Sequence, residues 1–591
     1  MATASKITIE ISGNEVPDFL HLSISQTIYG PHTFSLVCRR DLFEQPEAPP
    51  LSGAIDKIGS DITFLIDGIN TGTGIRDFFF RGIITGISAS ENGMNQHEVT
   101  FRGYSPEILL HGSPVCRSFE NKTLRQIAEQ VMQPYPSNQI SLTGEPGVNI
   151  VFPYIVQYKE TDFEFLSRLA RRFGQWFFFD GMDLVLGDFK KTTIEGIAGI
   201  NLSDYHIGAD LAPLNFGFSK IFYTPFGPST GTSTGPTKDI SGDLDPIGKK
   251  VYAQSQSTFP ITGNSYLPQL FIDDNGSYIP DQHFIRDEKK SIASRFVNVS
   301  GNSDEPLEPG NIFRIKRGNA GQEIDAGAFI ITGVNHSFDN SMNYSNMFQG
   351  VPSSLALAPN TKVKAAALCE TQSAIVKDNN DPQKLGRIKV HFSWQEDSQS
   401  TSWIRMVTPH TGQGAGIYFI PEIGHEVLVG FENSDPQLPY IIGSLFNSEN
   451  KPDEFWVTKS NDLKVIRTRS GNTIEFNDAE GHEEVCIYNG RKNDPANMMR
   501  LRVSNNGYEI YSKGPINLTS GDDITLKGKN IMLDAKEYID LHPAKRFQLY
   551  TDEAGVIDIT NDDNSMVFRN NEIHIEGALL VKIKGTNVEI N

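Results

Sequence analysis

Short units with the pattern apolar, polar, apolar repeat along the C-terminal part of the chain. The clearest begin with an isoleucine that recurs every seven or eight residues, and Met532 is their one apolar middle residue. The alternation predicts that each unit is a very short strand with one buried face. Gly and Asp residues between the units predict turns. These clearest units are Ile516-Asn517-Leu518, Ile524-Thr525-Leu526, Ile531-Met532-Leu533 and Ile539-Asp540-Leu541.

A strand of three residues cannot bury its own apolar face, so repeats of this kind are stabilised by stacking one unit on the next. A β-helix made by one chain needs about 18 residues for each circuit, and the repeat is too short for that. We therefore predict that three chains share each circuit around a common axis. A meander folded within one chain is the alternative. The residues expected at the trimer axis are Ile516, Leu518, Ile524, Leu526, Ile531, Leu533, Ile539 and Leu541.

The last repeats are expected to form the tip of this structure. Strand alternation places Val581, Ile583, Val588 and Ile590 on the inward face. The result would be a blunt apolar platform, which predicts a docking surface for a separate cap protein. His574 alternates with two isoleucines, so its side chain is expected to face solvent and to bind no metal.

The N-terminal part has a different pattern. Alternating strands separated by Gly and Asn predict a barrel or a strongly bent sheet over residues 1–110. A first helix is predicted after Thr123, with Gln126 completing a capping box. A second helix is predicted after Thr161, with Glu164 in the same role and Gly174 as its C-terminal cap.

Four short strands follow further along the chain, with Gly and Pro at the joints between them. They are predicted at 385–392, 403–407, 426–431 and 440–445. This number of strands in a short segment favours a small closed barrel of the OB type. The fold class is therefore predicted to be mainly β and multidomain.

Composition narrows the class of protein. The length of 591 residues predicts several domains. The net charge of −20 argues against a nucleic-acid partner. The four cysteines form no CxxC pair, which favours neither a zinc site nor a disulfide framework and fits synthesis in a reducing cytoplasm. The N-terminus leads directly into an alternating strand, so no signal peptide is expected.

Few residues are candidates for catalysis, nucleotide binding or metal binding. The segment 412–416 is rich in glycine but lacks the Lys-Ser/Thr ending of a phosphate loop, so a barrel turn is favoured. His391, His410 and His425 lack the spacing of a metal site. The acidic pairs at 522–523 and 562–563 are expected to be solvated turns. We therefore predict no catalytic residues, no cofactor, no metal and no enzymatic activity.

Two sets of motifs indicate a relationship to a known family. The first set is the run from Tyr158 to Ala170 followed by Trp176-Phe177-Phe178-Phe179. The second set lies in the predicted OB segment. Its residues are Gly386, Arg387, Trp394, Trp403, Pro421, Gly424, Glu426, Asp435, Pro436, Pro439 and Gly443. Together the two sets resemble the VgrG family, the trimeric spike proteins of type VI secretion, which are related to hub and needle proteins of contractile phage tails and extracellular injection particles.

The resemblance implies three regions. Residues 1–360 would form a hub of two β-barrel domains with a helical insert, residues 361–450 an OB-fold stalk, and residues 451–591 an intertwined trimeric β-prism needle. Glu422 and His425 stand where the family often has Arg and Gln. They do not affect the fold expectation.

The resemblance also implies a function. The chain would be a structural spike that punctures a target membrane, docks on an Hcp-type inner tube and baseplate at its N-terminal end, and carries a PAAR-type cap and effectors. It would assemble in the cytoplasm and then be secreted or injected. The alternatives are the spike of an extracellular injection particle or a phage-like tail and, less favoured, a spike with a wall-degrading activity.

Overall fold

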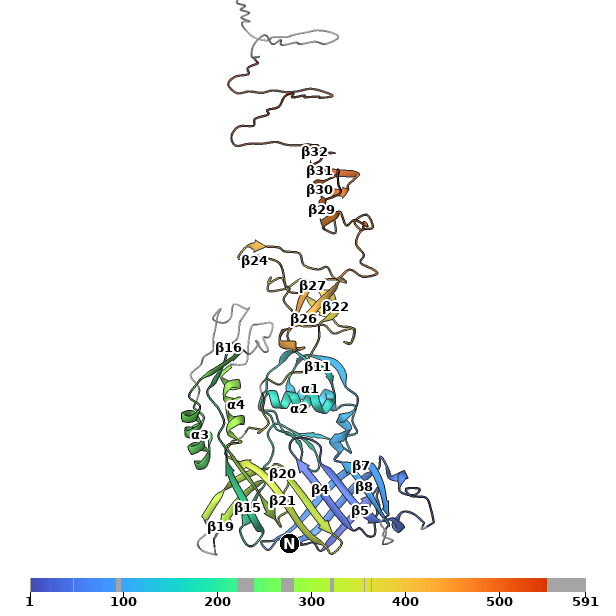
Figure 1. The fold of residues 1–591 in the computed structure, drawn as a ribbon, viewed down its shortest axis with the longest axis vertical. Coiled ribbons are helices and arrows are strands. Elements are labelled where there is room, and N and C mark those ends of the chain that lie inside the picture. The colour runs from blue at the N-terminus through green and yellow to red at the C-terminus, as the bar shows by residue number, and fades with distance from the viewer. Residues whose placement is uncertain are drawn as a thin grey trace, which may run out of the picture. The chain divides into compact units, whose positions relative to one another are not determined.

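The computed structural model describes residues 2–45, 47–91, 97–219, 239–266, 281–318, 324–355, 357–362 and 364–549. The chain forms two compact units, Met1–Val457 and Thr458–Asn591. Strands are the main regular element of the first unit and of the start of the second (Figure 1). The fold is therefore mainly β and multidomain, as the sequence predicts.

The N-terminal strands close into a barrel. Eight strands pair in a ring in the order β20, β4, β5, β8, β7, β6, β1 and β21, and β21 pairs again with β20. The two-residue strand β1 closes the ring between β6 and β21. Alternate side chains fill the interior, among them Ile24, Phe64 and Phe101. The bounds are Ala2–Thr3 for β1, His21–Thr27 for β4, Thr33–Arg39 for β5, Asp61–Asn70 for β6, Ile75–Glu91 for β7, His97–Tyr104 for β8, Ile324–Asp339 for β20 and Asn343–Pro352 for β21.

Strands β20 and β21 also belong to a second curved sheet. It runs β14, β19, β20, β21, β18, β15, and its two ends meet at a bridge between Ala198 and Leu202. It surrounds its own core, which includes Phe313 and Phe348. The hub thus contains two barrels that share a wall. The added strands are β14 Thr193–Ile197, β15 Leu202–Ala209, β18 Val297–Ser303 and β19 Ile312–Arg317.

Smaller elements decorate the two barrels. Strands β2 (Lys6–Ile11) and β3 (Asn14–Glu15) extend the first barrel beside β6. Strands β16 (Phe216–Ser219) and β17 (Gly263–Tyr266) form a parallel pair. The helices of the second barrel region are α3 (Pro246–Thr258) and α4 (Asp281–Ala293), and the 3-10 turns are η1 (Arg40–Leu42), η2 (Ile55–Lys57) and η4 (Ser241–Asp243).

A layer of helices and short strands is inserted between the two barrels in sequence. It packs around a core of its own that contains one face of α1 and one face of α2. Both predicted capping boxes are confirmed, Thr123 with Gln126 and Thr161 with Glu164. Gly174 has the positive φ expected of a C-terminal cap. The elements are η3 Pro106–His111, β9 Val115–Lys122, α1 Leu124–Met132, β10 Leu142–Thr143, β11 Phe152–Glu160, α2 Asp162–Arg172, β12 Phe177–Phe179 and β13 Leu184–Leu186.

The predicted OB barrel is present. Its sheet has the order β23, β22, β26, β27, and bridges from Ile404 to Ile388 and from Met406 to Ile441 close it. Strand β22 is an addition to the four strands predicted, and the segment 403–407 pairs only through these isolated bridges. The elements are β22 Gln372–Asp378, β23 Lys389–His391, β24 Thr411–Gly412, β25 Ala415–Gly416, β26 Glu426–Phe431, η5 Glu432–Ser434 and β27 Pro439–Ser444.

The second unit begins with an antiparallel meander of five strands in sequence order. They are β28 Leu463–Arg467, β29 Asn472–Asn477, β30 Glu484–Arg491, β31 Asp494–Arg502 and β32 Gly507–Ser512. A meander therefore precedes the repeats. The repeat units from Ile516 to Leu541 contain no strand in this single described chain. A strand requires ladder partners, which the trimer hypothesis assigns to other chains.

Candidate functional site: uncovered apolar rows and the hub–OB junction

One face of the five-stranded meander carries a row of apolar side chains. Strand register places Ile466, Ile474, Ile487, Met499 and Ile510 opposite one another in turn across the five strands. Each is between 37% and 50% exposed. Such cross-strand apolar pairs normally stabilise a sheet by burial. Here the row, which we call the meander row, lies open in a single chain.

The opposite face of the same sheet has a small core of its own. Cys486, Tyr488 and Met498 form a buried cluster there. The Tyr488 hydroxyl donates to Glu475 Oε2 over 2.8 Å. Lys492 forms ion pairs with Glu475 and with Glu484. The meander row has no comparable buried core in one chain.

The repeat residues expected at the trimer axis are all at the surface. Their exposed fractions lie between 51% and 70% in the isolated chain. We call them the axial ladder: Ile516, Leu518, Ile524, Leu526, Ile531, Leu533, Ile539 and Leu541. Their placement at an axis stays a prediction. The tip residues Val581, Ile583, Val588 and Ile590 and the neighbouring His574 lie outside the described residues.

A buried ion pair lies at the start of the OB motif set. Arg387 donates from Nε and Nη2 to the two carboxylate oxygens of Asp381, over 3.0 and 2.8 Å. Backbone amides of Gln383, Leu385 and Arg387 donate to the same carboxylate. Burial alone would raise the pKa of Asp381, but these hydrogen bonds lower it to about 2. The Gly-Arg motif therefore fixes a loop, which Gly386 turns with a φ of +71°.

The two motif tryptophans have structural contacts. Trp394 stacks on Phe392 at 5.2 Å between ring centroids, meets Tyr158 of the hub edge-on at 6.4 Å, and donates to Gln372 Oε1 over 2.9 Å. The Trp403 ring is buried under the Lys389 ammonium. Trp394 thus links the two motif sets that are far apart in sequence.

The second motif set continues this contact at Asp435. Its carboxylate accepts a hydrogen bond over 2.9 Å from Arg172 at the end of α2, and both side chains are almost completely buried. Arg172 Nη1 also donates to Gln437. Removing both charges from water costs free energy, and only a well-aligned contact between the two groups offsets this cost. We call this contact, together with the Tyr158–Trp394 contact, the hub–OB junction.

The other motif residues shape the strands and turns of the barrel. Gly424 turns the chain before β26 with a φ of +85°. Glu426 begins β26 and accepts a hydrogen bond from Asn447 over 2.9 Å. The carbonyl of Pro421 accepts from Asn379. Pro436 is buried beside Asp435, and Pro439 and Gly443 lie in β27.

Sequence reasoning missed several residues of the hub–OB junction. Gln395 donates to Ser118 Oγ over 2.8 Å, and Ser118 donates to Gln399 over 3.0 Å. The backbone amide of Ser400 donates to Glu120 of the hub. Glu370 contacts Tyr158 and Lys159, which belong to the first motif set. The other residues, Ser118, Glu120, Glu370, Gln395, Gln399 and Ser400, form no recognisable motif, and only the tertiary fold brings them together.

A chain of buried polar side chains lies inside the first barrel and ends on β20 and β21, the strands that both barrels share. Gln26 lies between His32 at 3.3 Å and His336 at 2.9 Å, and His336 contacts the Tyr344 hydroxyl at 2.9 Å. Burial lowers the pKa of both histidines to about 3. Both imidazoles are therefore neutral at physiological pH.

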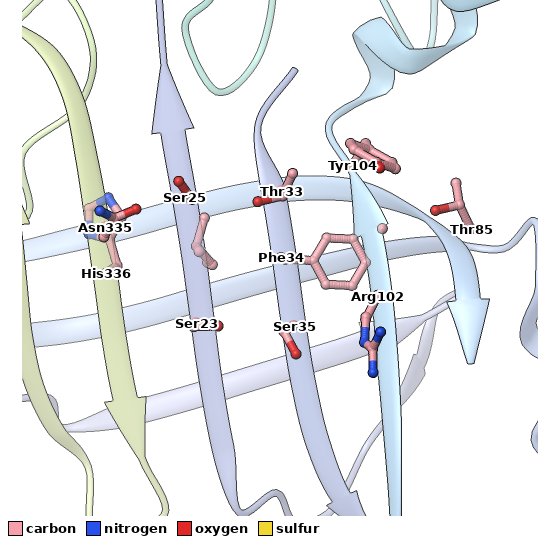
Figure 2. A pocket seen from close by; sticks show the side chains of 12 residues that line it. Ser23, Ser25, Thr33, Phe34, Ser35, Thr85, Arg102, Tyr104, Asn335 and His336 are labelled. Carbon is pink, nitrogen blue, oxygen red and sulfur yellow. The ribbon is translucent and has the colours of Figure 1, made fainter. Parts of the chain in front are cut away.

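The outer face of the first barrel has a shallow pocket near this chain. Figure 2 shows that hydroxyl groups line it, among them Ser23 and Ser25 on β4 and Ser35 on β5. His336 is next to them, but both its ring nitrogens bond inside the barrel. Because a general base must reach the proton of its nucleophile, this geometry does not form a serine–histidine pair.

The remaining candidates for chemistry have ordinary structural positions. Residues 411–416 form the hairpin of β24 and β25. His391 Nδ1 lies 2.9 Å from the carbonyl of Gln399. Asp522 and Asp523 are exposed, and the pair at 562–563 lies outside the described residues. Within the described ranges there is no group of three His, Cys, Asp or Glu side chains that could hold a metal. No helix in the same ranges is long and apolar enough to cross a membrane.

Two family descriptions match the regions that meet at the hub–OB junction. Residues 28–202 match the phage tail baseplate hub (GPD) family. Residues 372–446 match the type VI secretion system/phage-baseplate injector OB domain. The chain is thus similar to hub and injector proteins of phage baseplates and type VI secretion, and the predicted resemblance is confirmed.

Named relatives agree with this assignment. The chain is 25% identical over 466 residues to the type VI secretion system spike protein VgrG1a of Pseudomonas aeruginosa, covering 70% of this chain and 68% of that protein. Identity to VgrG1c of the same organism is 24%, covering 70% and 60%. The actin cross-linking toxin VgrG1 of Vibrio cholerae is 24% identical, and the match spans 36% of its length. The matches thus leave roughly a third of VgrG1a uncovered and larger shares of the other two relatives.

Solved structures support the fold. The half-lidded Francisella PdpA–VgrG complex superposes with a TM-score of 0.52 at 11% identity, covering 86% of this chain and 88% of that one. The lidded form of that complex gives 0.50 at 10% identity, covering 87% and 81%. At this identity the likeness establishes a VgrG-like architecture only.

Proposed function

We propose that this chain is the structural spike of a bacterial contractile injection apparatus of the type VI secretion class. It acts as a homotrimer. Its hub sits on an Hcp-type inner tube and baseplate, and its C-terminal part forms the needle that breaches the target membrane. The protein assembles in the cytoplasm and leaves the cell with the apparatus.

The observation that carries this proposal is the uncovered apolar surface of the second unit. The meander row and the axial ladder together place thirteen apolar side chains at the surface of one chain. Burying a side chain of this kind fully stabilises a protein by roughly 1.5–3 kcal/mol. Two further copies of the same chain would cover these rows around a common axis, since each copy offers the same uncovered face.

Light scattering on the full chain tests the assembly. We expect a mass about three times that of one chain at micromolar concentration. Dilution should yield unfolded or aggregated second units rather than folded monomers, because the needle core forms only between chains. A folded, stable monomer of the wild type at micromolar concentration would contradict the proposal.

A PAAR-type cap and effector proteins are the proposed partners at the needle end. The support is the continuation of the repeat to Val588-Glu589-Ile590, and the relatives' names describe spikes. Deleting Val581–Asn591 should abolish capture of a PAAR-type protein while the trimer survives. Equal capture by the deleted and full chains would exclude this docking site.

We also propose that the spike itself has no enzymatic activity. Relatives are named as spike proteins, whereas the toxin VgrG1 of Vibrio cholerae is matched over 36% of its length. Purified trimer should leave peptidoglycan, lipid and nucleic acid intact. Turnover that a point substitution in this chain abolishes would overturn the claim.

A further inference from the structure

The hub has a pocket of about 590 Å³ whose charge is opposite to that of the whole protein. It lies between the outer face of α2, the β4–β5 turn, and residues 362 and 364–366, which precede the OB barrel. Five cationic side chains and two carboxylates line it, in a chain of net charge −20. These are Lys159, Arg168, Arg171, Lys362 and Lys364 against Glu160 and Glu164.

Helical spacing explains how α2 serves both the core and this pocket. Glu164, Arg168 and Arg171 are four and then three residues apart, so they share one face of the helix. Leu166 and Leu169 lie on the opposite side and are buried in the core of the insert. The helix therefore fixes the positions of Arg168 and Arg171, whereas Lys362 lies outside any helix or strand.

Existing ion pairs account for part of the charge. Lys159 pairs with Glu370, and Arg168 forms a two-pronged pair with Glu160 at 2.6 and 2.7 Å. The Glu164 carboxylate accepts a hydrogen bond from the backbone amide of Thr161 at the start of α2. These contacts pair Lys159 and Arg168 with carboxylates.

Two other cations of the pocket have no carboxylate partner within the described part of the chain. Arg171 donates from Nε to the carbonyl of Asn360, and Lys362 is exposed and has no side-chain ion pair there. In addition, the Arg168 side chain is only 7% exposed, and its Nη1 atom is buried without a hydrogen-bond partner among the described residues. A buried guanidinium nitrogen without a partner is costly.

We propose that this pocket binds an oxyanion, the chemistry shared by free phosphate and by the carboxylates of an acidic peptide. Arg171 and Lys362 supply the uncompensated charge, and a planar guanidinium favours two-point contact with either group. This site goes beyond the proposed spike function. It lies within one unit of a single chain, so its test does not depend on the trimer.

Titration of the full-length protein by calorimetry at constant ionic strength tests the site. The two probes are inorganic phosphate and a blocked peptide of four glutamates. We expect saturable binding of at least one probe, weakened about tenfold or more in the double variant Arg171→Gln/Lys362→Gln. Saturation by phosphate alone identifies a small-anion site, and tighter binding of the peptide identifies an acidic segment of a partner.

The matched control removes two charges elsewhere on the hub. Arg102→Gln/Lys250→Gln changes exposed side chains outside the pocket and should bind the probes as the wild type does. A second variant, Lys362→Glu, should abolish binding while the thermal unfolding midpoint without probe stays unchanged. Absence of binding to the wild type, or equal affinity in the double variant and the control, overturns the proposal.

Discussion

The first barrel and the C-terminal meander follow the same alternation of side chains but differ in what covers their apolar faces. In the barrel, inward residues such as Ile24, Phe64 and Phe101 are 1% exposed or less, because the sheet closes on itself. In the meander, Ile474 and Ile487 remain 37% and 45% exposed. A closed sheet buries its own core, whereas an open five-stranded sheet requires a partner surface.

This difference separates two sources of stability. The barrels, the helical insert and the OB barrel each have a buried core within one chain. Their unfolding should not depend on protein concentration. The meander row and the axial ladder are completed only by other chains in the proposed trimer, so their stability should rise with concentration. Each prediction below tests one side of this division.

The largest effect is expected from Leu526→Asp in the axial ladder. The substitution would place three carboxylates near one axis, and leaving them unpaired should cost on the order of 3 kcal/mol or more per chain. We expect loss of the trimer in light scattering. Thr525→Asp is the matched control, since it adds the same charge at the neighbouring position predicted to face solvent. Equal effects of the two variants would show that the ladder does not face an axis.

A large but concentration-independent effect is expected at the hub–OB junction. Arg172→Ala leaves Asp435 as a buried charge without this ion pair, which should cost about 3–5 kcal/mol. The control is Arg405→Ala, because the Arg405–Glu432 pair is substantially exposed and should contribute less than about 1 kcal/mol. Denaturant unfolding of the first unit at several concentrations measures both. A similar cost in both variants would mean that the junction is not tightly packed.

Acid should destabilise the hub through its buried histidines. His32 and His336 have a pKa of about 3 in the folded state against 6.5 in the unfolded state, so the unfolded chain takes up protons first. Their contribution to stability is complete above pH 6.5 and is lost progressively as the pH falls towards 3. Below that value no further loss comes from these groups.

The variant His336→Gln should reduce this loss, because it removes one of the two titrating groups and retains a polar side chain beside Gln26. His21→Gln, at an exposed position of β4, is the control and should follow the wild-type curve. The measurement is the thermal unfolding midpoint of the hub between pH 7 and pH 4. An unchanged slope in His336→Gln would show that other groups cause the acid sensitivity.

The elements predicted correctly from the sequence are those that depend on residues close together along the chain. The capping boxes at Thr123 and Thr161 depend on residues three positions apart. Most strands of the OB barrel follow from short apolar runs bounded by Gly and Pro. The motif sets led to a resemblance that the comparisons confirm. In each case, the decisive contacts lie within one helix, turn or short segment.

The features that the sequence did not reveal depend on contacts between residues that are far apart along the chain. The ring of the first barrel closes through Ala2 and Tyr344, at opposite ends of the hub. Strand β22 was missed because its charged and small residues dilute the alternation. The contacts of Gln395 and Gln399 with Ser118 follow no pattern. The repeat units were predicted as strands, yet one chain alone offers no ladder for them.

The smallest effect is expected at the cap of α1, in the part of the molecule that is complete within one chain. Thr123→Ala removes the hydroxyl oxygen that accepts a hydrogen bond from the backbone amide of Gln126. This loss should lower the free energy of unfolding by about 1 kcal/mol. Thr123→Ser retains the acceptor and should stay within a few tenths of the wild type. Both values should be independent of protein concentration, because α1 packs inside the core of the insert. Denaturant unfolding of the first unit at low and high micromolar concentrations measures this. A cap effect that grows on dilution would mean that the hub, like the needle, requires neighbouring chains for its stability.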